Sequence, residues 1–443
     1  MAKTKITRRQ FGKLSAGAAA LGFTTNIFVP RRAHARDAKL VFWLQPNFNA
    51  KADDLLIAQT MEYARSKGLS DSDVSIEKVP GGEVVPRMAA ALEIGAPPDV
   101  TRVNEPNMVN WGPNGHLVDL TPVIEDMRSR EDGINEDTLL MAKIDGEILG
   151  APMGIAASAA HVRIDKFREA GYDQLPATWE EFIEAAKKIN QPPFYACGMA
   201  LGLTPSDSLV DILSVVDAYG GSLVDGQNRP AFESDGTIEA FKLIDAMYNE
   251  HRIIPRSSLS WDNSANNKAY QSGQIAYALN PTSIYSSLIN DQSELLDLTV
   301  LDVPPGGPAG RHATVSTDYY GVFKQAQDVD LAVGLVAHFM KPENYDAFIT
   351  EAGGRYLPVY PAQLTQPFWA ENAAFDGLRA AARTGRSMFY PGKLTPALSE
   401  VVVRTMVQAE VQNMLVKGKE AAAAVADVQK QMIETFERLG EPV

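Results

Sequence analysis

Apolar positions along residues 39–100 alternate between short continuous runs and stretches with helical spacing. The runs are typical of buried strands, and the stretches are typical of amphipathic helices. The predicted strands cover residues 39–44, 74–79 and 98–100, and the predicted helices cover residues 53–67 and 85–92. This order of strand, helix, strand, helix, strand is typical of a parallel sheet covered by helices.

The middle of the chain continues in the same style. Thr178 precedes an apolar helical face and Glu181 follows three residues later, which is the pattern of a capping box at a helix start. The run 304–308, Pro-Pro-Gly-Gly-Pro, ends the last of the predicted strands. The predicted strands here cover residues 149–153, 160–163, 274–279 and 298–303, and a second helix covers residues 237–248.

The C-terminal third is predicted to be mostly helical. One helix covers residues 329–340, and another is expected from Pro396, capped by Thr395, to the stop at Gly418. A last helix, 425–439, has one apolar stripe. The fold class predicted from these patterns is α/β, with helices clearly outnumbering strands.

The charge of the chain is unevenly placed. Hydrophobic residues make up 45% and charged residues 22%, as in an ordinary globular protein. The net charge is −14; residues 1–35 carry seven basic residues and no acid, so subtracting this +7 leaves −21 on the rest. Such an acidic chain argues against nucleic acid or an anionic membrane as a partner. Cys197 is the only cysteine, which excludes an intrachain disulfide and a cysteine zinc cluster.

The first 35 residues have the organisation of an export signal. Met1–Lys13 is basic, Leu14–Val29 is weakly apolar and too short to span a bilayer comfortably, and Ala33–Ala35 is a small-x-small cleavage site. Within the basic part, Thr7–Phe11 resembles the twin-arginine export signal. We therefore expect a mature protein that begins near Arg36 and works in the periplasm. A basic cytoplasmic tail or an uncleaved anchor is the alternative.

A set of motifs in the mature chain, taken in order, is similar to one known family. The chain resembles the extracellular solute-binding proteins of ABC importers, the family that includes maltose-binding protein. Each motif is a loose match, and the ordered set covers nearly the whole mature chain. The matching stretches are Asp145–Pro152, Asp165–Gly171, Leu175–Phe182, Tyr270–Tyr277, Gly353–Val359 and Lys419–Ala422.

The resemblance implies a two-lobed periplasmic binding protein-like fold of type II. Each lobe has a central sheet flanked by helices, and the chain crosses between lobes near Pro152–Ala156, Val303–Gly307 and Arg355–Pro358. It also implies a monomer that closes on a small-molecule ligand, a sugar in the family's pattern. The permease subunits of an ABC transporter then recognise the closed state. The implied parts are the signal peptide 1–35, an N-terminal lobe 36–153 plus 306–355, and a C-terminal lobe 156–303 plus 358–443.

Two departures from the family pattern bear on the ligand. Val162-Arg163 stands where the family usually has an aromatic residue followed by Asn. The segment Asn280–Tyr285 lacks the tryptophan that stacks on sugar in maltose-binding relatives. The resemblance therefore supports the family and does not support a maltodextrin as the ligand.

A carbohydrate or polyol site needs aromatic platforms and hydrogen-bonding side chains, because sugars present apolar C–H faces and many hydroxyls. We expect these side chains on strand-end loops and at the crossings. The candidate ligand-binding residues are Trp43, Asn47, Phe48, Asn104, Glu105, Asn107, Trp261, Asp262, Asn280, Tyr319, Arg355 and Tyr356, and the first loop also offers Gln45.

Trp261 is the most specific of these candidates. It stands in the polar run Ser257–Ser264, where the sequence offers little apolar surface to bury an indole. An exposed ring without a core face is best explained as a stacking platform. We therefore expect Trp261 to face the ligand from the C-terminal lobe.

The sequence shows no catalytic constellation. It has no G-x-S-x-G, P-loop or G-x-G-x-x-G motif, and none of the six histidines is placed at i, i+4 from another. We expect no catalysis, no cofactor and no metal. A secreted glycoside hydrolase is the enzyme alternative. Adjacent tyrosines can bind ferric iron in related folds, but Tyr319 and Tyr320 would point to opposite strand faces.

Two non-sugar ligands stay open as alternatives. A polyamine site needs several carboxylates with aromatic stacking, a role that Glu105 and Asp262 could serve. A glycerol phosphate diester needs arginine and helix N-termini, a role that Arg355 could serve. The sequence does not decide between these and a sugar.

Overall fold

The computed structural model describes residues 38–130 and 133–443. The predicted export signal, residues 1–35, lies outside the described residues. Ala38–Val443 forms one compact unit, and all that follows concerns this unit. Within the described ranges, none of the helices combines the length and apolar character needed to cross a bilayer.

The first sheet has five strands in the order β2-β1-β3-β10-β6. β1 (Leu40–Leu44) pairs in parallel with β2 (Val74–Lys78) and with β3 (Val100–Val103). The connecting helices are α2 (Ala50–Ser66) and α3 (Gly81–Glu93). The predicted parallel strand–helix–strand order of this region is confirmed, with element ends shifted by a few residues.

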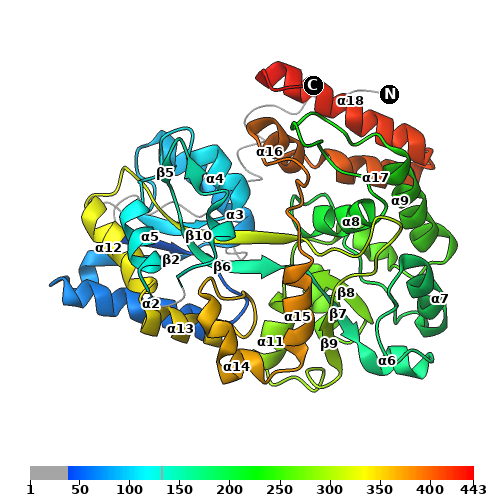
Figure 1. Ribbon diagram of the computed structural model, residues 1–443, viewed down its shortest axis with the longest axis horizontal. Helices are drawn as coiled ribbons and strands as arrows, with labels where there is room; N and C mark the ends of the chain where they lie inside the picture. The colour runs from blue at the N-terminus through cyan, green and yellow to red at the C-terminus, as the bar shows by residue number, and fades with distance from the viewer. Residues whose placement is uncertain (1–37, 131–132) are drawn as a thin grey trace, which may run out of the picture. The chain divides into compact units, whose positions relative to one another are not determined.

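Two antiparallel strands complete this sheet and extend it toward the rest of the molecule (Figure 1). β10 (Val315–Val322) lies between β3 and β6 (Ala151–Ala157). β10 is not among the strands that the apolar pattern predicts, because its first half is polar. Its pairing with β6 shifts register between Asp318 and Tyr319, which marks a β-bulge.

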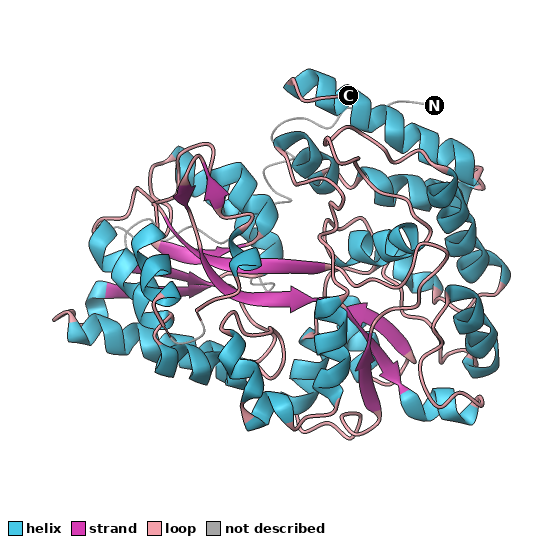
Figure 2. Cartoon of the chain, viewed as in Figure 1, coloured by secondary structure: helices cyan, strands magenta, loops and turns pink. Residues whose placement is uncertain are grey.

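The second sheet has three antiparallel strands in the order β8-β7-β9. These are β7 (Ala159–Arg163), β8 (Tyr277–Asn280) and β9 (Thr299–Asp302), in agreement with the predicted strands. Figure 2 shows that helices surround this sheet and fill most of this side of the molecule. The nearby helices are α6 (Ile164–Glu169), α7 (Trp179–Ile189), α8 (Asp207–Ala218), α9 (Asp235–Asp245), α10 (Ala265–Gln271) and α11 (Ser283–Asn290).

Each sheet has its own large hydrophobic core. The first core gathers the five-stranded sheet with α2, α3 and the helices that cover it. The second gathers β7 and β8 with α7, α8, α9 and the last helices of the chain. The α/β class and the two-lobed organisation predicted from the sequence are therefore confirmed. The first core also takes in Trp369 and Phe375, which lie beyond the third expected crossing, so the lobe boundaries given above stay a prediction.

The remaining helices are short except at the C-terminus. α18 packs on α16 and α17, and this group packs on α8 and α9 (Figure 1). The further helices are α4 (Glu105–Trp111), α5 (Thr121–Arg128), α12 (Val329–Phe339), α13 (Pro342–Glu351), α14 (Pro367–Ala370), α15 (Ala374–Arg383), α16 (Pro396–Val403), α17 (Met406–Lys417) and α18 (Ala421–Leu439). A two-stranded hairpin pairs β4 (Lys143–Ile144) with β5 (Glu147–Ile148).

The single helix predicted from Pro396 to Gly418 is wrong. Thr395 does cap α16, accepting a hydrogen bond from the backbone of Leu398, but the helix ends at Val403. Thr405 then adopts φ 51°, in the left-handed region, and α17 begins after it. The β-branched run before this break is a weak helix former, so the apolar spacing alone did not reveal the turn.

Three stretches of chain pass between the two sheets. β6 leads into β7 through Ser158, and the loop after β9 leads back into β10. The third stretch pairs with the first: Ile155 and Leu357 exchange backbone hydrogen bonds of 3.0 and 2.9 Å. Arg311 ties the second stretch together, donating to the carbonyls of Val303 and Pro304. These stretches contain the segments expected as hinge strands, and their motion stays a prediction.

Candidate ligand-binding site

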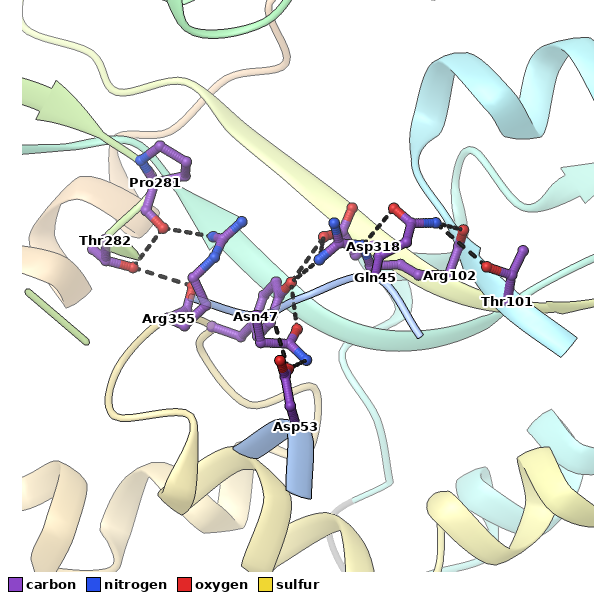
Figure 3. Close-up of polar contacts among 10 residues, drawn as sticks. Gln45, Asn47, Asp53, Thr101, Arg102, Pro281, Thr282, Asp318 and Arg355 are labelled. Carbon is purple, nitrogen blue, oxygen red and sulfur yellow. Dashed lines mark hydrogen bonds and ion pairs between the residues drawn. The ribbon is translucent and has the colours of Figure 1, made fainter. Parts of the chain in front are cut away.

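One side of the candidate site is the edge of the five-stranded sheet where β1 and β3 end. Gln45 follows β1 and donates to the carbonyl of Arg102, at 2.6 Å; its side-chain oxygen accepts from Arg102 Nε at 3.2 Å. Asn47 donates twice to Asp53 Oδ1, from its backbone N at 2.9 Å and from Nδ2 at 3.0 Å. Because parallel strands end at the same edge, these polar side chains gather there (Figure 3).

Tyr356, fully buried, connects this edge to the third crossing. Its hydroxyl accepts from Arg102 Nη1 at 2.8 Å and lies 3.1 Å from Asp318 Oδ2 and 3.4 Å from Asn47 Oδ1. Arg102 and Asp318 also form an ion pair at 3.7 Å. One phenol therefore joins four chain segments in a network that we call the Tyr356 network: Asn47, Arg102, Asp318 and Tyr356.

Asp318 reaches this network because it lies on the same face of β10 as Tyr320, which is paired with Arg102 of β3. The β-bulge belongs to the neighbouring strand: Met153 of β6 is the extra residue between the pairs Asp318–Gly154 and Tyr319–Pro152. The two tyrosines that follow separate: Tyr319 lies against Gly150, and Tyr320 packs on Phe339 with ring centroids 5.0 Å apart. Tyr319 and Tyr320 therefore do not converge on one point.

Glu105 begins α4 close to the bulge. Asn104 caps this helix, its side-chain oxygen accepting from the backbone of Asn107 at 3.0 Å. Glu105 is 8% exposed, and its Oε1 accepts from the backbone of Thr317 at 3.0 Å. Burial raises the pKa of Glu105 to about 7; the bond from Thr317 lowers it and the negative charge of Asp318 raises it further. This carboxyl can therefore donate or accept a hydrogen bond near neutral pH.

The other side of the site is the turn between β8 and α11 (Figure 3). Arg355 Nη1 donates to the carbonyl of Pro281 at 2.6 Å, and its guanidinium lies 4.6 Å from the centroid of the Tyr356 ring. Thr282 has φ 63°, and its hydroxyl lies 2.7 Å from the carbonyl of Gly354 and 3.1 Å from that of Arg355. The third crossing is thereby fixed against the start of α11.

Asn280 lies beside this turn, but its amide is occupied by protein. Its Nδ2 donates to Asn267 at 2.9 Å, Asn267 donates to Ser283 at 2.9 Å, and Ser283 donates back to Asn280 at 2.7 Å. The three residues are buried and hold α10, β8 and α11 together. Asn280 therefore has a structural role in this conformation, and its predicted ligand contact stays a prediction.

The expectation that Trp261 lacks a core face is wrong. Trp261 is 8% exposed and belongs to a third hydrophobic cluster with Tyr270, Ile275 and Ile284. These partners come from α10, α11 and the strand region between them, so the polar run around Trp261 gave no sign of them. Asp262, next to it, is exposed; hydrogen bonds from Ser264 hold the pKa of Asp262 below its usual range.

The remaining aromatic candidates divide into buried and exposed. Trp43 is 8% exposed in the first core, with the Arg87 guanidinium 5.1 Å from its ring centroid. Phe48 is 43% exposed, and its carbonyl accepts from Ser287 on α11 at 3.0 Å. Among the candidate rings, Phe48 alone presents a large free face in the described structure.

Sequence reasoning missed several polar residues of the site. Arg102 lies in a strand and Asp318 in the polar half of β10, and neither stands in a motif that signals a ligand contact. Asp207, at the start of α8, accepts from Asn266 Nδ2 at 3.0 Å. Burial raises the pKa of Asp207 to about 6, against the lowering effects of Asn266 and the positive charge of Arg355. Their roles depend on strand pairing and long-range packing, which local patterns do not reveal.

Known proteins resemble this chain in sequence and in fold. The model of the bacterial extracellular solute-binding protein family matches residues 63–377. A Brucella abortus (strain 2308) protein, named as a binding protein, is 22% identical over 315 residues, which cover 70% of this chain and 75% of that protein.

Solved structures share the fold at low identity. Maltose-bound MalE3 of T. maritima has a TM-score of 0.76 at 19% identity, covering 88% of this chain and 98% of that one. A Thermotoga lettingae TMO solute-binding protein with α-D-tagatose has a TM-score of 0.78 at 16% identity, with 90% and 100% covered. An Agrobacterium radiobacter K84 solute-binding protein with ribitol has 0.76 at 19%, with 90% and 99% covered. The chain belongs to the bacterial extracellular solute-binding protein family.

Proposed function

We propose that this solute-binding protein captures a carbohydrate or polyol at the Tyr356 network and the facing turn before α11, and delivers it to the permease subunits of an ABC importer. The observation that carries the proposal is that polar side chains from both sides meet there. Asn47, Asp318 and Tyr356 come from the five-stranded sheet and the third crossing, and Arg355 is fixed to Pro281 on the other side.

The ligands of the structural relatives support this class of solute. The proteins with the same fold hold maltose, tagatose and ribitol, which share a high density of hydroxyls. A hydroxyl both donates and accepts, so it suits a site that mixes carboxylate, amide, phenol and guanidinium groups. The Tyr356 network and Glu105 supply these groups at one edge.

Hydrogen bonding, more than stacking, is the recognition mode that we propose. Trp43, Trp261, Tyr319 and Tyr356 are each at most 8% exposed, and their ring faces pack against protein. We keep Asn47, Glu105, Arg355 and Tyr356 as the central ligand contacts. Less central contacts are Trp43, Phe48, Asn104, Asn107, Trp261, Asp262, Asn280 and Tyr319.

The rest of the proposed role follows the family and the N-terminal sequence. We propose export by the twin-arginine route, a monomeric receptor, and release of the solute chemically unchanged. The pair Arg8–Arg9 supports the route. Replacing both by lysine should leave the precursor unprocessed in the cytoplasm, and normal processing of that variant would contradict the route.

Ligand capture is tested by thermal melting of the mature protein against a panel of sugars, polyols and one polyamine. A ligand that binds the native state raises the melting temperature, by an amount that grows with its concentration over its Kd. Hits are then titrated by calorimetry, and the solute is recovered for mass spectrometry. We expect a polyhydroxylated hit recovered intact; steady conversion of the solute would contradict a receptor, and binding of the polyamine alone would contradict the ligand class.

A further inference from the structure

Two arginines are buried among the described residues, and they differ in their ion pairs and hydrogen bonds. Arg163 and Arg355 are each 7% exposed. Arg163 makes a two-point contact with Asp165, with Nε to Oδ1 at 2.9 Å and Nη2 to Oδ2 at 2.6 Å. Arg355 makes no ion pair with any described acid; it donates once, to Pro281, and its buried Nε has no acceptor. Burying a charge without a counter-ion costs free energy, and the Arg355 guanidinium lacks one among the described residues.

The groups around Arg355 do not neutralise its positive charge. The acid of the Tyr356 network, Asp318, is already paired with Arg102 at 3.7 Å. The charge of Arg355 lowers the pKa of Asp207, but Asp207 lies beyond ion-pair distance and accepts a hydrogen bond from Asn266 instead. The neighbouring aromatic face, the ring of Tyr356, attracts a cation without neutralising it.

The start of α11 adds a second positive element at the same place. α11 begins at Ser283, and the preceding Thr282 bonds to the carbonyls of Gly354 and Arg355. The backbone N–H of Ile284 is bonded to Asn280 Oδ1, and the aligned peptide dipoles still give the helix start a partial positive charge. A guanidinium without a counter-ion, placed beside a helix start, favours the binding of an anion.

We propose that Arg355 is the specificity-determining residue of the site and that the natural solute is a polyhydroxylated compound bearing an anionic group, a carboxylate or a phosphate ester. This inference rests on the proposed function and narrows it. The guanidinium fork offers Nε and Nη2 to two oxygens of one anionic group, the geometry that Arg163 already makes with Asp165. The hydroxyls of the solute are left to Glu105 and the Tyr356 network.

The first test compares matched solutes on the mature protein. Two series are titrated by calorimetry: D-glucose, D-glucuronate and D-glucose 6-phosphate, then ribitol, ribonate and ribitol 5-phosphate. We expect at least one anionic member to bind 10-fold or more tighter than its neutral parent, and the two arms show whether a carboxylate or a phosphate is preferred. Neutral parents that bind as tightly as, or tighter than, both anions would overturn the inference.

Substitution of Arg355 gives the second test. Arg355→Gln should remove the preference for the anion, with a loss of 10-fold or more for the anionic solute and at most about 3-fold for the neutral one. Arg355→Lys keeps the charge without the fork and should fall between. The matched control is Arg163→Gln, which removes the other buried arginine and should leave the anion-to-neutral ratio unchanged. An unchanged ratio in Arg355→Gln would overturn the proposal.

The outcomes separate this inference from the function on which it rests. If neutral solutes bind and anions do not, the inference fails and the proposed function stands. If a folded protein, checked by its melting transition, binds no member of either series, the proposed function fails together with the inference. If Arg355→Gln does not fold, the ratios measured on the unaltered protein still decide.

Discussion

The two sides of the candidate site differ in where their hydrogen bonds end. On the side of the five-stranded sheet, the Tyr356 network links side chains from the loop after β1, from β3, from β10 and from the third crossing. On the side of α11, the side chains of Asn280, Asn267 and Ser283 bond to one another, and Asn280 also accepts from the backbone of Ile284. Contact with the third crossing runs through backbone carbonyls. The first side is a set of linked polar groups, which we propose bind the solute. The second side holds Arg355 through the carbonyl of Pro281.

This difference teaches that burial alone does not identify a ligand contact. Asn280 and Asn47 are both 1% exposed, yet Asn280 is fully engaged in packing helices together, while Asn47 is tied to a network that reaches the facing side. Arg355 is buried as well, but its donors are incompletely used. The informative property of a buried polar group is therefore the state of its hydrogen bonds.

The first prediction concerns Trp261 on the side of α11, where we expect the largest effect. Trp261→Ala should lower the free energy of unfolding by about 3–5 kcal/mol, because it empties a packed cluster of Tyr270, Ile275 and Ile284. Denaturant unfolding followed by fluorescence measures it. The control is Leu203→Ala, where the side chain is 56% exposed and a change within about 0.5 kcal/mol is expected. A small change at Trp261 with a large loss of solute affinity would restore the stacking platform.

Trp261 also shows how far the sequence could lead. The parallel strands β1, β2 and β3 of the first sheet were predictable from their own apolar positions, whereas β10 was not. The helix starts at Thr178 and Thr395 were predictable because capping is local. The core around Trp261 was not predictable, because its partners lie on elements separated along the chain. The polar residues around Trp261 led to the prediction of an exposed ring, but tertiary packing buries it.

The site was only partly predictable, for a related reason. Loops at strand ends pointed to Asn47 and Glu105, and the resemblance to the family pointed to Arg355 and Tyr356. Asp318 depends on the pairing of β10 with β3, which the sequence of one strand does not contain. Arg102 could not be recognised as a site residue from its sequence, because its partners Tyr356 and Asp318 lie far away along the chain.

The second prediction breaks the network on the sheet side. Asp318→Ala should lower the free energy of unfolding by about 2–4 kcal/mol, because it leaves Arg102 largely buried without its counter-ion. The matched control is Asp71→Ala, which breaks the exposed pair with Arg65 and should cost within about 1 kcal/mol. Denaturant unfolding of both variants measures the difference. Equal costs would mean that the Arg102–Asp318 pair behaves as a surface pair.

The third prediction concerns Glu105 and pH. Burial raises the pKa of Glu105 to about 7 from an ordinary value near 4.5, so the folded protein holds this proton more tightly than the unfolded chain does. Its stabilising contribution is therefore complete below about pH 4.5 and is lost as pH rises through about 7, with a total of about 1–3 kcal/mol. Glu105→Gln imitates the protonated form, so its stability should gain on the unaltered protein as pH rises from 5 to 8. A constant difference across that range would contradict the raised pKa.

The last and smallest effect compares two fully buried phenols, Tyr356 and Tyr320. The Tyr356 hydroxyl contacts Arg102, Asp318 and Asn47, whereas the Tyr320 hydroxyl has no partner among the described residues. Tyr356→Phe should cost about 1–2 kcal/mol of unfolding free energy and weaken solute binding, because three groups lose a bond. Tyr320→Phe removes the same atom from an equally buried ring and should be neutral or slightly stabilising, since an unpaired polar atom leaves the core. Because both changes delete one oxygen and leave both rings in place, the difference between them isolates hydrogen bonding from packing. Equal effects in unfolding and calorimetry would mean that Tyr356 acts only as packing.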